Sequence, residues 1–128
     1  MTDHDRVAHA LAQGGIIDIT TTGRSSGQPR RIEIVFFNVD GRVYITGLPG
    51  TRGWLANLKA DPRLTFHLKR GPVADLPGTA RIVTEEAERR SVVDTACRAW
   101  NRPNQVEAFA AGSPVIEVLF EDGYLQSA

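Results

Sequence analysis

Glycine, arginine and serine residues cluster between Thr20 and Arg31, where the chain reads TTTGRSSGQPRR. Glycines at positions 23 and 27 favour a tight turn, and hydroxyl and guanidinium groups surround them. Backbone amides and arginine side chains in one turn suit the recognition of a phosphate or a carboxylate. The residues fit a plain surface hairpin equally well, so this stretch predicts either an anion site or an exposed turn.

Positive charge is concentrated around this turn. The formal net charge of the chain is zero, yet residues 24–70 contain nine basic and three acidic side chains. Such a local excess raises the concentration of anions near the surface. The alternative interpretation is a set of scattered, solvated arginines on a β-surface. Nucleic acid is not an expected partner, because the basic stretch lacks the interleaved aromatic residues of a strand-stacking surface.

The usual catalytic and metal-binding motifs are missing. The chain has no phosphate-binding lysine loop, no GxGxxG and no HExxH. Its three histidines lack partners at ligand spacing, and Cys97 is the single cysteine. We therefore predict no metal site and assign no catalytic residue. Chemistry on a bound organic cofactor stays open, because the cofactor then supplies the reactivity and the protein positions it.

The elements that must position the turn are mostly strands. Alternating or β-branched segments predict strands at 16–22, 29–39, 42–46, 63–69, 79–84 and 114–121. Asp40-Gly41 predicts a hairpin between the second and third of these. Helical spacing predicts helices at 3–13 and from an N-cap at Thr84 to Trp100, a helical turn or two at 52–60 and a further short helix at 105–111. A loop is expected at 71–78. The expected fold is α+β, mainly β: a barrel of about six strands with about three helices.

Length and composition favour one domain over residues 1–128. No run of about 18 apolar residues exists to form a transmembrane helix. The acidic N-terminus, with Asp3 and Asp5, lacks the basic start and apolar stretch of a signal peptide. A lone cysteine suits a reducing compartment. We therefore expect a cytoplasmic protein.

Two motifs in this chain resemble a known family. Residues 21–30 (TTGRSSGQPR) and 53–63 (GWLANLKADPR), on either side of the Asp40-Gly41 hairpin, resemble the deazaflavin-dependent nitroreductases, which include quinone reductases. The resemblance runs from about Gly15 to Lys69. It implies a split β-barrel of the flavin-reductase type and the use of coenzyme F420.

The resemblance also implies roles for particular residues. The phosphate-bearing tail of the coenzyme would be held by Gly23, Arg24, Ser26, Gly27 and Arg30. Trp54 and Asn57 would shape the wall near the deazaflavin ring. Many members have a lysine where this chain has Ser25, and a lysine-containing loop where it has the short segment 47–51. Arg31 or Arg52 would then replace the missing charge. No tyrosine matches the one on the family's substrate side, since Tyr124 lies beyond the last predicted strand.

Three functions follow as hypotheses. The first is an F420-dependent oxidoreductase that transfers hydride to a quinone-like or nitroaromatic acceptor. The second is a fatty-acid-binding protein without enzymatic activity, as expected of a shorter branch of the family, at the inner face of the membrane and with His67 and Asp75 in its pocket. The third is a reductase that binds flavin mononucleotide (FMN). A homodimer is compatible with each.

Overall fold

The structure is a computed structural model that describes residues 2–122. Its elements in chain order are α1 (Asp3–Gln13), β1 (Gly15–Thr22), β2 (Pro29–Val39), β3 (Arg42–Thr46), α2 (Gly53–Ala60), β4 (Arg63–Leu68), β5 (Ala74–Ile82), α3 (Glu86–Ala99), the 3-10 turn η1 (Pro103–Gln105), α4 (Val106–Gly112) and β6 (Val115–Phe120). The strands close into an antiparallel barrel in the order β1-β2-β3-β6-β5-β4. The predicted mainly-β fold with a six-stranded barrel is confirmed.

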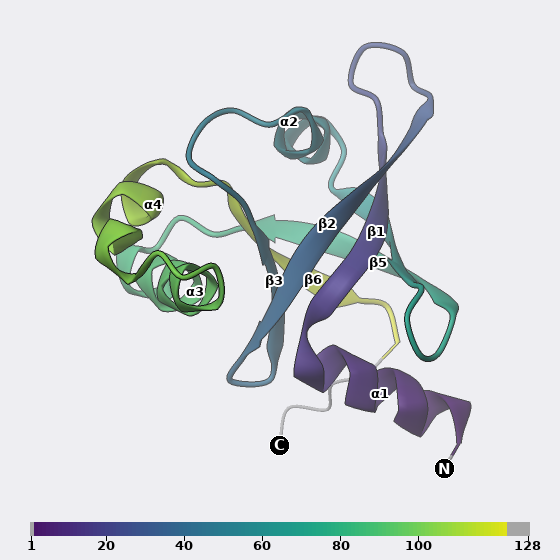
Figure 1. The fold of residues 1–128 in the computed structure, drawn as a ribbon. Helices are drawn as coiled ribbons and strands as arrows, with labels where there is room; N and C mark the ends of the chain where they lie inside the picture. The colour runs from purple at the N-terminus through teal and green to yellow at the C-terminus, as the bar shows by residue number, and fades with distance from the viewer. Residues whose placement is uncertain (1, 123–128) are drawn as a thin grey trace.

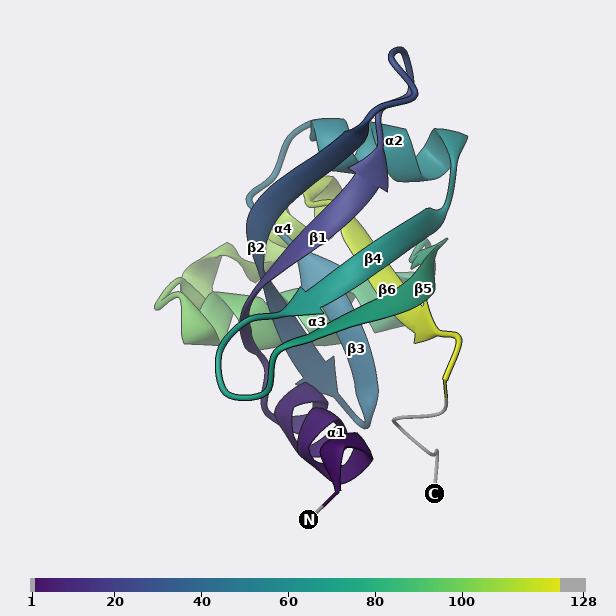
Figure 2. The same cartoon turned by 90° about the vertical axis from the view of Figure 1, so that its right-hand side faces the viewer.

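The barrel has two different ends. Helix α1 lies at one end, and the β1–β2 turn projects from the other with α2 beside it (Figures 1 and 2). Pairing of β1 with β4 stops at Thr20–Thr65, and pairing of β2 with β3 stops at Phe36–Ile45. The β1–β2 pairing continues beyond both points to Thr22–Pro29. The hairpin therefore extends past the barrel as a two-stranded arm over α2.

Aromatic rings fill the barrel interior. Phe66 packs edge-to-face against Phe36 and Phe120, with ring centroids 5.1 and 5.2 Å apart. Alternate residues of β1 and β2, such as Ile17 and Ile34, point the same way and join this core. Edge-to-face pairs suit the quadrupoles of the rings. Packing in the core thus determines which side chains of β2 point inward, and this alternation continues along the strand into the arm.

Helices α3 and α4 pack on the outside of the barrel near β3 (Figure 1). Phe37, on the opposite face of β2 from Phe36, contacts Trp100 with ring centroids 5.6 Å apart. Val92, Val93, Ala96 and Cys97 of α3 are buried as predicted. Trp100 is only half-buried, because it follows the end of α3 and lines a cavity described below.

Two predictions about local structure are wrong. The expected loop at 71–78 is mostly strand, since β5 starts at Ala74 and pairs Leu76 with Phe66. Pro77 obscured this strand in the sequence; it precedes the β5–β6 pairing, which begins at Gly78, so its missing N–H breaks no bond there. The N-cap of α3 is Glu85 rather than Thr84, because the Glu85 carboxylate accepts a hydrogen bond from the Glu88 amide.

The Asp40-Gly41 turn agrees with its prediction. Both residues have positive φ, 54° and 83°, as a type I′ hairpin requires.

A polar cluster lies between the barrel and α3. The Tyr44 hydroxyl donates to Glu88 at 2.6 Å, and Arg81 bonds both Glu88 and the buried Glu117. Burial raises the pKa of Tyr44 to about 12, and the hydrogen bond to Glu88 adds to the shift. A raised pKa in the folded state means that the unfolded chain loses this proton first.

We therefore expect Tyr44 to titrate near pH 12 rather than near its ordinary value of 10. Its contribution to the free energy of unfolding is complete below pH 10 and is lost as pH rises through the folded-state value. The difference in tyrosinate absorbance between the wild type and Tyr44→Phe isolates this group from the second tyrosine of the chain. A difference curve with its midpoint near pH 10 would contradict the prediction.

Candidate functional site

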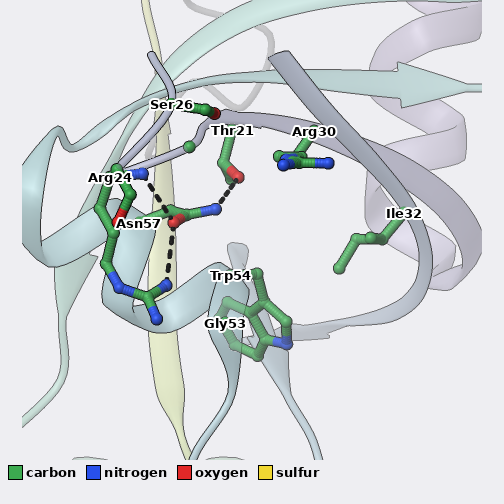
Figure 3. Close-up of a pocket in the computed structure, with 10 residues that line it drawn as sticks. Thr21, Arg24, Ser26, Arg30, Ile32, Gly53, Trp54 and Asn57 are labelled. Atoms are coloured by element: carbon green, nitrogen blue, oxygen red, sulfur yellow. Dashed lines mark hydrogen bonds between the residues drawn. The ribbon is translucent and has the colours of Figure 1, made fainter. Parts of the chain in front are cut away.

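A cavity of about 380 Å³ lies where the β1–β2 arm meets the start of α2. Its lining residues are Thr21, Gly23, Arg24, Ser25, Ser26, Arg30, Ile32, Gly53, Trp54 and Asn57. In Figure 3, Arg24 and Asn57 lie on one side of it, Arg30 and Ile32 on the other, and Trp54 below. We call this space the arm cavity.

The turn that forms its upper rim is tight and internally bonded. The Gly23 amide donates to the Gln28 carbonyl, and the Gly27 amide to the Gly23 carbonyl, both at 2.8 Å. A Cβ on Gly23 would lie 2.6 Å from the Ser26 hydroxyl oxygen, and Gly27 has φ +68°. Position 27 therefore favours glycine by its backbone conformation, and a side chain at position 23 would displace the Ser26 hydroxyl. The Ser26 hydroxyl accepts from the Gln28 amide at 3.1 Å and so braces the turn.

The glycine amides are thus used within the turn. The backbone amides of Ser25 and Ser26 have no acceptor among residues 2–122. Consecutive open amides form a nest that binds anions. Both serines line the arm cavity, so their amides are candidate backbone donors to a ligand there.

Asn57 connects the arm to α2. Its side chain is 7% exposed. Its carbonyl oxygen accepts from the Arg24 amide at 3.1 Å and from the Arg24 guanidinium at 3.3 Å. Its amide nitrogen donates to the Thr21 hydroxyl at 3.1 Å. These bonds, drawn in Figure 3, hold the Arg24 side chain before any ligand binds.

The arm cavity is electropositive. No carboxylate lines it, and the Arg30 guanidinium has no hydrogen-bond or ion-pair partner among residues 2–122. No side chain caps the N-terminus of α2, which begins at Gly53 in the cavity wall. The partial positive charge of a helix N-terminus adds to that of the two arginines. The cavity therefore suits a phosphate or carboxylate group.

A second cavity, of about 580 Å³, lies where β2 separates from β3. Its lining residues are Ile32, Glu33, Ile34, Val35, Thr46, Gly47, Leu48, Arg52, Trp54, Trp100 and Arg102. Because side chains alternate along a strand, four consecutive residues from β2 show that the strand presents its unpaired edge. We call this space the edge cavity.

The two cavities adjoin, because Ile32 and Trp54 line both. Trp54 is 8% exposed and packs on the barrel core. An elongated ligand with an anionic group in the arm cavity can thus place a flat apolar part against Trp54 in the edge cavity. The size of each space is in the range of ordinary small-molecule sites.

Most predicted site residues meet at these cavities. Gly23, Arg24, Ser26, Arg30, Trp54 and Asn57 line the arm cavity, and Gly27 shapes its turn. Arg52 lines the edge cavity instead. Arg31 lies apart from both: its side chain bonds Asp18 at 2.9 Å on the outer barrel face. Its predicted contact with a cofactor stays a prediction.

His67 and Asp75 also lie on the outer barrel face, away from both cavities. His67 Nδ1 is 2.7 Å from Asp75 Oδ1, and its Nε2 is 2.6 Å from the Thr20 hydroxyl. The hydrogen bond from His67 lowers the pKa of Asp75. Tyr124 lies outside the described residues.

Sequence reasoning did not single out Trp100 and Arg102 as lining residues. They follow α3 in the chain, about 50 residues after Arg52, and reach the edge cavity only because α3 packs beside β3. No local sequence motif indicates that these two residues line a cavity.

Within the part of the chain that the structure describes, no three metal-binding side chains lie close enough to hold an ion. No helix there is long and apolar enough to cross a membrane.

Solved structures share this fold at low sequence identity. Rv2991, a conserved hypothetical protein of Mycobacterium tuberculosis, is 20% identical with a TM-score of 0.72, over 93% of this chain and 78% of that one. A putative pyridoxamine 5'-phosphate oxidase of Listeria innocua is 13% identical with a TM-score of 0.73, over 93% and 94%. A FAD-binding protein of Mesorhizobium loti is 14% identical with a TM-score of 0.67, over 95% and 91%. The fold is therefore the split β-barrel that the sequence predicted.

A family model matches nearly the whole described chain. It covers residues 2–115 and describes an F420H(2)-dependent quinone reductase. The match includes both motifs and every residue that lines the two cavities. The chain belongs to the F420H(2)-dependent quinone reductase family.

Proposed function

We propose that this protein is an oxidoreductase that binds coenzyme F420 and reduces a quinone-like or nitroaromatic acceptor. The observation that carries the proposal is the pair of adjoining cavities, one electropositive and free of carboxylates, the other mostly apolar. Family membership supports the same coenzyme.

The residues fit the coenzyme's chemistry. Its phosphate-bearing tail would be held by the guanidinium groups of Arg24 and Arg30 and by the open amides of Ser25 and Ser26. Its ring would lie against Trp54. The reduced coenzyme supplies a hydride when bound.

The protein's part is positioning and exclusion of water. Asn57 fixes Arg24, so the anion site is organised before binding and little freedom is lost. Ile32, Ile34 and Trp54 give the edge cavity an apolar wall on which two flat molecules can lie close together. Proximity of this kind accelerates a transfer without a dedicated acid–base pair.

Titration with the coenzyme tests the proposal. We expect the fluorescence of F420 to change on addition of the protein, with a dissociation constant of roughly micromolar or below. FMN should bind more weakly in a parallel titration. Reduced F420 should then be oxidised when menadione is added with the protein present.

Three results would contradict the proposal. They are unchanged F420 fluorescence at any protein concentration, tighter binding of FMN than of F420, and a stoichiometric acyl chain in the native mass spectrum of the freshly purified protein. The last would favour the fatty-acid-binding hypothesis.

A further inference from the structure

The edge cavity carries positive charge at one end. Arg52, before α2, and Arg102, after α3, both line it. Arg52 donates to the carbonyls of Thr51 and Leu48 at 2.8 and 2.9 Å. Arg102 donates to the Gln105 side-chain oxygen at 3.2 Å. All three acceptors are neutral, so neither guanidinium is balanced by a carboxylate among residues 2–122.

The one acid in the lining does not cancel this charge. Glu33 is bound by Lys69 at 2.5 Å on the outer face of β2. Two groups stand out among the basic residues of the described chain. Arg31, Arg63 and Lys69 are paired with carboxylates. Arg24, Arg30, Arg52 and Arg102 line the two cavities without such a partner.

The rest of the edge cavity is mostly apolar and contains both tryptophans of the chain. Trp54 and Trp100 join Ile32, Ile34, Val35 and Leu48 in its wall. Indole surfaces favour flat aromatic ligands through offset stacking. Two arginines beside such a wall suit a planar ring that bears an acid group, because arginine binds carboxylates in bidentate fashion.

We propose that the edge cavity selects an aromatic carboxylic acid, with its carboxylate on Arg102 and Arg52 and its ring against Trp54 and Trp100. As a statement about the hydride acceptor, this rests on the proposed function. The acceptor gains a hydride from the reduced coenzyme, which loses the same two electrons, and a proton from solvent. The carboxylate is unchanged in the reaction and serves only recognition.

The binding experiment needs no coenzyme. 1-Naphthoate and its neutral analogue 1-naphthalenemethanol are titrated into the protein by calorimetry, while the two indole N–H signals are followed by NMR. We expect naphthoate to bind about tenfold or more tightly than the alcohol. Both indole signals should shift, because the chain has only these two tryptophans and both line the cavity.

Variants at Arg102 test whether this guanidinium binds the carboxylate of the probe. Arg102→Gln should weaken naphthoate binding roughly ten- to a hundredfold and leave the alcohol unchanged, while Arg102→Lys should retain part of the affinity. The matched control is Arg98→Gln, since Arg98 is an exposed arginine of α3 that pairs with Asp94 and lines neither cavity. The control should bind both probes like the wild type.

Several outcomes would overturn the proposal. One is equal affinity for the acid and the alcohol, and another is no effect of Arg102→Gln. A third is tighter binding of octanoate than of naphthoate, which would indicate that the edge cavity takes an acyl chain rather than an aromatic ring. Failure of F420 to bind would remove the proposed function but leave acid binding intact, so the two failures are distinguishable.

Discussion

The double variant Arg24→Gln, Arg30→Gln should lose coenzyme binding almost completely, with the dissociation constant for F420 raised roughly 100-fold or more. Each guanidinium would make a charge-assisted contact with the phosphate, and such contacts are among the strongest hydrogen bonds in proteins. Neither arginine makes an ion pair that the fold needs. Fluorescence titration measures the loss, and circular dichroism checks that the fold is kept.

Two comparison variants sharpen this test. Arg70→Gln removes an exposed arginine from the β4–β5 loop, at the α1 end of the barrel (Figure 2), and should bind F420 like the wild type. Arg31→Gln removes a residue that the sequence suggested for the site but that pairs with Asp18 elsewhere. We expect it to bind like Arg70→Gln. If the double variant retained wild-type affinity, the arm cavity would not be the phosphate site.

Asn57→Ala should weaken both the fold and the site. The side chain is buried and makes three hydrogen bonds to the arm, so its removal leaves the Thr21 hydroxyl and the Arg24 amide without a partner. Unsatisfied buried groups cost about 1–3 kcal/mol in the free energy of unfolding. Arg24 would also lose its fixed position, and F420 should bind about tenfold more weakly. Urea unfolding and F420 titration measure the two effects.

Asn57→Asp separates these contributions. A carboxylate keeps the acceptor for Arg24, so the free energy of unfolding should fall less than in Asn57→Ala. It also places a negative charge in a cavity that has none, so F420 should bind more weakly than in Asn57→Ala. Equal F420 affinities in these two variants would show that the anion does not sit beside Asn57.

The barrel could be predicted because its strands carry local signals. Asp40-Gly41 specifies its turn by backbone conformation alone, and the alternation of Leu64, Phe66 and Leu68 marks β4. The strand β5 was missed at its start because prolines at 72 and 77 look like loop residues. A proline is tolerated there only because the neighbouring strand β6 ends opposite Gly78 and so does not reach Pro77, which is a tertiary fact.

The residues of the candidate site could be predicted only where they lie within a recognisable sequence motif. Gly23, Arg24, Arg30 and Asn57 lie in two motifs that the fold brings together. Which arginine faces a cavity depends on strand register: Arg30 and Arg31 are neighbours, yet alternation sends them to opposite faces. The edge cavity exists because β2 and β3 stop pairing at Phe36–Ile45. No residue type in the sequence indicates where this pairing ends.

The origin of the lining residues has a consequence for how such proteins diversify. Every residue of the arm cavity comes from positions 21–57, whereas the edge cavity also draws on Trp100 and Arg102 from the connection after α3. Substitutions in that connection can change what enters the edge cavity without touching the anion site. Under the proposed function, relatives can therefore keep one coenzyme and evolve different acceptors, with selection acting on the short segment that holds Trp100 and Arg102.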